Sequence, residues 1–158
     1  MIALLIAEDD DRKFGDVVEL LDVQFPGVFE RTRVTNVIET EDAALSGRFT
    51  ACILDISMNI APGATSSSVK GGHADLGGME VIEKLFYYDS DLRVIILTGF
   101  DIFDDNSRGP TSKVLKGFEE ICSEAERSLG NKLIATIRYG NPGWQDQLIH
   151  GLSLVIKT

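Results

Sequence analysis

The sequence predicts an α/β fold in which a five-stranded parallel sheet carries helices on both faces. Three observations support this prediction. Short, continuous apolar runs at residues 2–6, 51–54 and 94–97 are typical of strands buried on both faces. Apolar residues recur at helical spacing after each run. The strand and helix patterns alternate without a linker or a repeat, which favours a doubly wound sheet.

Each element follows from local patterns. Strands are predicted at residues 2–7, 31–38, 51–55, 92–98 and 133–139. Helices are predicted at residues 14–25, 40–45, 79–87, 114–129 and 144–156. Pro26-Gly27 ends the first helix, Gly130 ends the fourth, and Thr40 is the expected N-cap of the second. The 158 residues fit a single domain.

Two segments break the regular alternation. Residues 59–77 contain Pro62, Gly63, three serines and a Gly-Gly pair, and they show no apolar period, so they predict a loop insertion. Residues 99–130 form an extended loop and helix, in which 100–112 is polar and reads as loop. A loop that begins where the third strand ends would start beside any site at that end of the sheet.

Composition and charge exclude several classes of function. The net charge of -10 leaves no basic patch for direct nucleic-acid binding or for an anionic membrane surface. No apolar run approaches the length of a bilayer span, and the N-terminus lacks the basic start of a signal peptide. Cys52 and Cys122 lie on apolar segments, where buried free thiols in a reducing cytosol are expected. The chain is therefore predicted to be a cytoplasmic protein.

Acidic residues and one hydroxyl stand where the predicted strands end. Glu8 and Asp9 follow the first strand, Asp55 closes the third, and Thr98 closes the fourth. The carboxyl ends of parallel strands meet at one edge of a sheet, so these side chains should converge. Oxygen ligands of this kind suit Mg²⁺, which can neutralise a phosphoryl group. Acids also favour helix starts, so a single acid such as Asp9 is explained by that alone, whereas an unpaired charge at Asp55 would be costly.

The order of these parts resembles the receiver domain of bacterial two-component response regulators, which has a flavodoxin-like fold. The segments that carry the resemblance are Ile6-Ala7-Glu8-Asp9-Asp10, Ile53-Leu54-Asp55-Ile56-Ser57-Met58, Gly78-Met79-Glu80-Val81-Ile82 and Ile96-Leu97-Thr98-Gly99. The resemblance implies that Asp55 is the phosphoacceptor and Thr98 the switch hydroxyl. It also implies Mg²⁺ held by Glu8, Asp9, Asp55 and the backbone carbonyl of Ser57.

The chain departs from that family where a positive charge is expected. The family has a Lys before a Pro after the fifth strand, and here Asn141 stands at that position. Lys70 or His73 in the insertion could supply the missing cation. Arg138 stands where the family carries an aromatic switch residue, and Tyr139 is one residue out of step, so it should point to the other face of a regular strand unless a bulge intervenes.

Three functions remain open. The leading hypothesis is a stand-alone receiver, not an enzyme, that takes a phosphoryl group on Asp55 from a histidine kinase or phosphotransfer protein. It would signal by contact with a downstream protein or by forming a homodimer. The alternative is a pseudo-receiver, an interaction module that works without phosphorylation. A Mg²⁺-dependent phosphohydrolase with an aspartyl-phosphate is the third, although Ser57 stands where the haloacid-dehalogenase type needs a second Asp.

Overall fold

The computed structural model describes residues 1–58, 74–99, 102–105 and 114–157. Its main sheet has five strands in the order β2-β1-β3-β5-β8, and each neighbouring pair in it is parallel. The strands are β1 (Ile2–Ala7), β2 (Phe29–Val34), β3 (Ala51–Leu54), β5 (Arg93–Thr98) and β8 (Leu133–Arg138). The predicted doubly wound α/β fold is confirmed.

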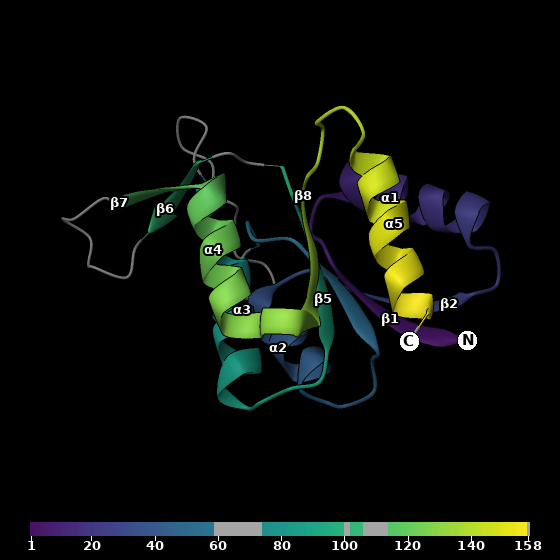
Figure 1. The fold of residues 1–158 in the computed structure, drawn as a ribbon, viewed down its shortest axis with the longest axis horizontal. Coiled ribbons are helices and arrows are strands. Elements are labelled where there is room, and N and C mark those ends of the chain that lie inside the picture. Colours follow the sequence, from purple (N-terminus) through teal and green to yellow (C-terminus); the bar gives the residue numbers. More distant parts are fainter. Residues whose placement is uncertain (59–73, 100–101, 106–113, 158) are drawn as a thin grey trace.

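Helices cover both faces of this sheet (Figure 1). The helices are α1 (Asp11–Gln24), α2 (Val37–Ala44), α3 (Gly77–Tyr87), α4 (Phe118–Leu129) and α5 (Trp144–Ile156), and a 3₁₀ turn at Gly130–Lys132 follows α4. Helices α1 and α5 lie on one face, and α2, α3 and α4 lie on the other. This division follows from the right-handed crossovers that join parallel strands.

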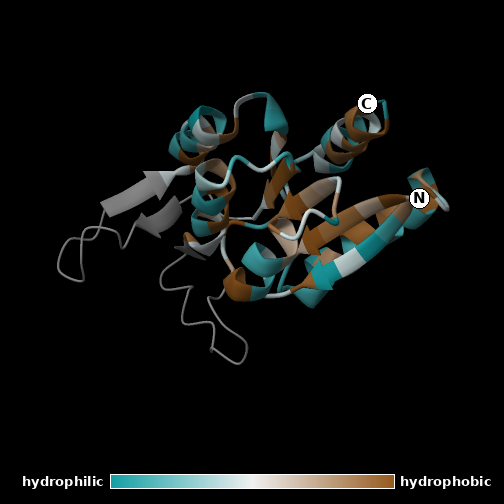
Figure 2. Cartoon of the chain, turned by 90° about the horizontal axis from the view of Figure 1, so that it is seen from below, coloured by the Kyte–Doolittle hydropathy of each residue, from teal (hydrophilic) through white to brown (hydrophobic). Residues whose placement is uncertain are grey.

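The core consists of two apolar layers separated by the sheet. Successive residues of a strand point to opposite faces, so Leu4 and Ile6 pack towards α1 and α5, whereas Leu5 and Ala7 pack towards the other helices. The central strands are accordingly hydrophobic over most of their length, and the edge strand β2 is polar in its middle (Figure 2). The continuous apolar runs in the sequence reflect this burial on both faces.

Helices α1 and α2 each begin three residues earlier than predicted, and in both cases an Asx residue upstream acts as the cap. Helix α1 begins at Asp11 because the side chain of Asp10 accepts hydrogen bonds from the backbone N–H groups of Arg12 and Lys13. Helix α2 begins at Val37, capped by Asn36. Thr40 is therefore inside α2, where its hydroxyl donates to the Asn36 carbonyl, and its prediction as the cap is wrong.

A second, three-stranded sheet replaces part of the two irregular segments. Its strands are β4 (Ala74–Asp75), β6 (Ile102–Asp105) and β7 (Val114–Gly117), in the order β4-β6-β7, with β6 and β7 antiparallel. Strand β4 lies within the predicted insertion at 59–77, and β6 within the predicted loop. The predicted helix from 114 begins only at Phe118, so its first four residues were assigned wrongly.

The two cysteines and the lengths of the helices are also subjects of prediction from the sequence. Cys52 is buried and Cys122 is half-buried, and both are free thiols. Burial raises the pKa of Cys52 to about 12, so this thiol stays protonated and behaves as a small apolar side chain. Within the described residues, no helix has the length and apolarity needed to span a membrane.

Candidate functional site

The carboxyl edge of the main sheet brings the predicted acids together. Ala7, the last residue of β1, pairs with Leu54, the last residue of β3, so Glu8 and Asp55 leave the sheet side by side. Carboxylate oxygens of Glu8, Asp9 and Asp55 all lie within 4.8 Å of one another. The sequence therefore predicted correctly that these residues converge, and the register of the parallel strands is the physical cause.

The side chains at this edge are almost completely removed from solvent. Glu8 is 4% exposed, Asp55 3% and Thr98 0%, whereas Asp9 is half-buried. The backbone N–H of Asp10 donates to Glu8 Oε2 at 3.1 Å, and the Ser57 hydroxyl donates to Asp55 Oδ2 at 3.0 Å. Glu8 and Asp55 are thus each positioned by a hydrogen bond from a residue two positions along the chain.

Lys13 is the residue of this site that sequence reasoning missed. It is 4% exposed. Its Nζ lies 2.6 Å from Glu8 Oε1 and 3.3 Å from Asp55 Oδ1, and it donates to the backbone carbonyl of Leu97 at 2.5 Å. A signal for it exists in the sequence, because Lys13 lies four residues before Val17 and eight before Leu21. These positions share the buried stripe of α1, where a lysine needs acidic partners.

The electrostatics of the site follow from packing several acids together. Burial, with the nearby Asp55 second, raises the pKa of Glu8 to about 8. The same two causes raise the pKa of Asp9. Burial alone would lower the pKa of Lys13, but the carboxylates of Asp55 and Glu8 outweigh it and raise that pKa. Lys13 is therefore held as a charged ammonium group, whereas the crowding of the acids favours the protonated form of Glu8 and Asp9.

Two buried oxygens at this edge have no hydrogen-bond partner among the described residues. They are Asp55 Oδ1 and Thr98 Oγ1. Asp55 Oδ1 lies near Lys13 Nζ, but without the geometry of a hydrogen bond. Buried polar atoms are normally satisfied, so such atoms point to a ligand or an ion. Together with three clustered carboxylates, they fit a hard divalent cation and a group rich in oxygen atoms.

Gly77 and Gly78 support the loop that carries Asp55. A Cβ at Gly78 would lie 2.4 Å from the backbone oxygen of Asp55, and one at Gly77 would lie 2.3 Å from that of Met58. The N–H of Gly78 donates to the Ile56 carbonyl at 2.7 Å. Only glycine lets the start of α3 approach this closely, so the pair holds the acceptor loop in place.

Asn141, which stands at the family's Lys position, lies in the turn between β8 and α5. The side chain of Asn141 is exposed on the turn before α5, and its backbone N–H and carbonyl bond to Arg138 and Trp144. Lys70 and His73 lie outside the described residues, so their suggested role stays a prediction. Lys13 already occupies the place where a cation was missing.

Arg138 and Tyr139 point to opposite faces of β8. Arg138 pairs in register with Thr98, and its guanidinium lies 5.6 Å from the Phe118 ring of α4. The Tyr139 hydroxyl donates to Asp16 of α1, and its ring packs edge-on against Trp144 with centroids 5.0 Å apart. The only register shift between β5 and β8 lies at Val94 and Ile95, away from this end, so the regular alternation is confirmed.

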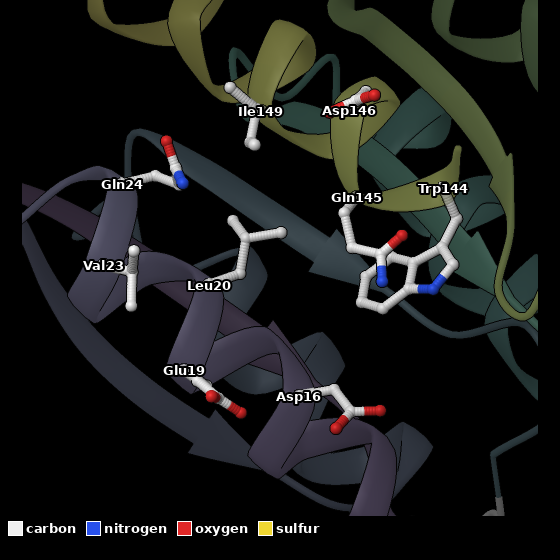
Figure 3. Close-up of a pocket in the computed structure, with 9 residues that line it drawn as sticks. All are labelled: Asp16, Glu19, Leu20, Val23, Gln24, Trp144, Gln145, Asp146 and Ile149. Atoms are coloured by element: carbon white, nitrogen blue, oxygen red, sulfur yellow. The ribbon is translucent and has the colours of Figure 1, made fainter. Parts of the chain in front are cut away.

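A cavity of about 460 Å³ lies between helices α1 and α5 (Figure 3). Its lining combines acidic and apolar side chains, with Asp16, Glu19 and Asp146 around Leu20 and Trp144. The lining includes none of the clustered acids and no basic residue. This cavity is therefore not a phosphate-binding site. Tyr139 links it to the acidic edge, because its hydroxyl donates to Asp16 in the cavity wall and the centre of its ring lies 5.6 Å from Lys13 Nζ.

Solved structures of receiver domains share this fold. A response regulator from Colwellia psychrerythraea matches with a TM-score of 0.61 and 17% identity, over 99% of this chain and 98% of that chain. A LuxR-family DNA-binding response regulator from Staphylococcus aureus has a TM-score of 0.61 and 19% identity, over 98% of both chains. These likenesses establish that the chain has the receiver fold.

A third similar structure is informative about metals in this fold. It is the receiver domain of a sensor histidine kinase from Pseudomonas aeruginosa, with a magnesium ion coordinated in its active-site cleft. Its TM-score is 0.60 at 14% identity, over 99% of this chain and 98% of that chain. By sequence, no protein-family model matches the chain, and no curated protein matches it either.

Proposed function

We propose that this chain is a response-regulator receiver that accepts a phosphoryl group on Asp55. The observation that carries the proposal is the pair of buried, unpartnered oxygens, Asp55 Oδ1 and Thr98 Oγ1, beside the acids Glu8 and Asp9. A resting protein gains nothing from burying such atoms without partners, whereas a phosphoryl group on Asp55 would offer acceptors to the Thr98 hydroxyl.

The proposed reaction is a phosphoryl transfer between two nucleophiles. A carboxylate oxygen of Asp55 attacks the phosphorus of the donor, and a new P–O bond forms. At the same time the bond from phosphorus to the leaving group of the donor breaks, and the leaving group keeps the electron pair. The leaving group is the imidazole nitrogen of a phosphohistidine or the carboxylate of an acyl phosphate. Catalysis then consists of positioning and charge stabilisation.

The acids fit Mg²⁺ as the cofactor. Glu8, Asp9 and Asp55 would contribute carboxylate oxygens, and the Ser57 backbone carbonyl would complete the protein's ligands. When bound, the ion supplies positive charge that neutralises phosphoryl oxygens. The local hydrogen bonds from Asp10 N–H to Glu8 and from the Ser57 hydroxyl to Asp55 keep both carboxylates oriented for this task.

A histidine kinase or a phosphotransfer protein is the proposed source of the phosphoryl group, and a protein contact is the proposed output, in keeping with a signalling domain of the cytoplasm. The strongly negative net charge supports protein partners over nucleic acid. A homodimer is one form that the output contact could take.

The proposal is tested by incubating the protein with acetyl phosphate and Mg²⁺ and measuring its intact mass. We expect one added phosphoryl group in the wild type and none in the Asp55→Asn variant. Omitting Mg²⁺ by adding EDTA should suppress the modification. An unmodified wild type would contradict the proposal.

One observation favours the pseudo-receiver as a second candidate. Asn141 brings no charge to the turn where the family has Lys, and it is exposed. In that case the fold would act as an interaction module without phosphorylation. Failure of the protein to bind Mg²⁺ at millimolar concentration would support this candidate over the first.

A further inference from the structure

We propose that Lys13, in the first turn of α1, supplies the positive charge that contacts the phosphoryl group on Asp55. This inference rests on the proposed phosphoacceptor function. In this proposal a residue of α1 provides the positive charge that Asn141, in the turn after β8, does not provide. The evidence is the position of one ammonium group relative to the reacting carboxylate.

The Lys13 ammonium is already beside the atom that would react. Its Nζ lies 3.3 Å from Asp55 Oδ1, the carboxylate oxygen that lacks a hydrogen bond. Any phosphoryl group bonded to Asp55 therefore forms within reach of the ammonium. An N⁺–H donor facing a phosphoryl oxygen makes one of the stronger hydrogen bonds available to a protein.

The structure fixes this ammonium from three directions. Glu8 Oε1 and the Leu97 carbonyl accept from it, and Asp10 caps the helix that carries it. Lysine has three N–H donors, so two hold the side chain in place and the third remains available for an acceptor on Asp55. Such anchoring means that little side-chain entropy is lost when the phosphoryl group arrives.

Arg33 is another cation near the acids among the described residues, and its guanidinium contacts the Glu8 backbone and the side chains of Asp11 and Phe14. Its Nε donates to the backbone carbonyl of Glu8 at 3.0 Å, its Nη2 bonds to Asp11, and its guanidinium stacks over Phe14. Arg33 therefore touches the backbone of the acidic loop, whereas Lys13 touches the carboxylates themselves.

Lys13 and a divalent cation are complementary and do not exclude each other. The three acids carry three negative charges when ionised, and one ammonium together with one Mg²⁺ balances them. The competing explanation is that Lys13 is only a structural counter-ion for buried acids. On that explanation its removal would strengthen Mg²⁺ binding and leave phosphorylation of Asp55 as fast or faster.

The test compares Lys13→Met and Lys13→Gln with the wild type in acetyl phosphate and millimolar Mg²⁺, so that the acids retain a counter-charge. Lys132→Met is the matched control, because it removes a lysine from an ion pair with Asp89 at the opposite edge of the sheet. Circular dichroism establishes folding, and isothermal titration calorimetry measures Mg²⁺ binding.

We expect both Lys13 variants to bind Mg²⁺ at least as tightly as the wild type but to be phosphorylated about 10- to 100-fold more slowly, the loss typical of a charge-assisted hydrogen bond. The Gln variant keeps a polar side chain, so it carries the test if the Met variant does not fold. A wild-type rate in a folded Lys13 variant overturns the assignment of Lys13 alone. An unmodified wild type overturns the proposed function and this inference together.

Discussion

Nζ of Lys13, in the first turn of α1, lies 3.3 Å from Oδ1 of Asp55, at the end of β3. The helix cap at Asp10 and the strand end at Leu54 create this relationship, so both the folding and the chemistry of the site depend on how α1 begins. The consequences can be tested separately for the hydroxyl, the acids, the glycine pair and the cap.

Replacing Thr98 with Val should stabilise the resting protein while impairing its phosphorylated form. The Thr98 hydroxyl is buried and unpartnered among the described residues, so removing it relieves about 1 kcal/mol of desolvation cost. Thermal unfolding should shift upward by roughly 2–4 °C. The acyl phosphate on Asp55 should have a shorter lifetime, because its oxygens lose the Thr98 hydroxyl as a donor. A lower melting temperature would show that the hydroxyl has a partner in the resting state.

Stability of the metal-free protein should fall as pH rises from about 5 to 8. The pKa of Glu8 is raised to about 8 in the folded state, so its contribution to stability is fully present below the ordinary value of 4.5 and is lost on approaching 8. The raised pKa of Asp9 acts in the same direction. The raised pKa of Lys13 matters only above its ordinary value of 10.5 and does not compensate.

The corresponding measurement is urea unfolding at several pH values, with and without Mg²⁺. We expect a loss on the order of 2 kcal/mol without metal, largely removed by Mg²⁺ at pH 8. Affinity for Mg²⁺ should increase over the same pH range, because Glu8 must lose its proton to bind the ion. In Glu8→Gln the pH dependence should become shallower. A metal-free stability that rises from pH 5 to 8 would contradict the electrostatic account.

Gly78→Ala should destabilise the loop that carries Asp55, although the substitution adds only one methyl group. The added Cβ would lie 2.4 Å from the Asp55 carbonyl oxygen and 2.6 Å from Ile56 Cα, both of them backbone atoms that cannot move aside cheaply. We expect a loss of about 1–3 kcal/mol in stability together with weaker Mg²⁺ binding. Gly15→Ala is the control, because its Cβ would meet nothing within 4 Å. Equal effects of the two substitutions would refute the proposed close approach.

Asp10→Ala should lower stability and slow phosphorylation together. The side chain of Asp10 caps α1 through Arg12 and Lys13, and loss of an N-cap costs about 1 kcal/mol. The same loss frees the turn that holds the Lys13 ammonium beside Asp55. Asp10→Ser, which restores a capping oxygen without a charge, should recover most of both properties. Recovery of stability without recovery of the rate would point to a direct role for the Asp10 carboxylate.

The sheet and its acids could be predicted because both follow from short-range patterns. Continuous apolar runs identify strands buried on both faces, and parallel topology then forces Glu8 and Asp55 to one edge. Lys13 could not be found by searching for the family's Lys near Asn141, because its position depends on the phase of α1. That phase is set by the cap at Asp10, four residues earlier than Phe14, the first apolar residue used to place the helix.

The second sheet shows the limit of such reasoning. Val114 and Leu115 extend the apolar stripe of α4 in sequence, and a short apolar pair fits a helix or a strand equally well. The pairing of β7 with β6 decides the structure at this position. That pairing joins segments separated in the chain, and no local pattern specifies it. The close approach at Gly77, which the sequence assigns to the loop insertion, is likewise invisible to a local pattern, because it depends on the backbone of Met58 that packs against it.

The most direct test of the account is to locate the modified residue. The protein would be treated with acetyl phosphate and Mg²⁺, reduced with borohydride, which converts an aspartyl phosphate to homoserine, and mapped by peptide mass spectrometry. The account predicts homoserine at position 55 alone, and none when EDTA replaces Mg²⁺. Modification at another acid, or no modification in a protein that binds Mg²⁺, would contradict the central claim that Asp55 is the phosphoacceptor.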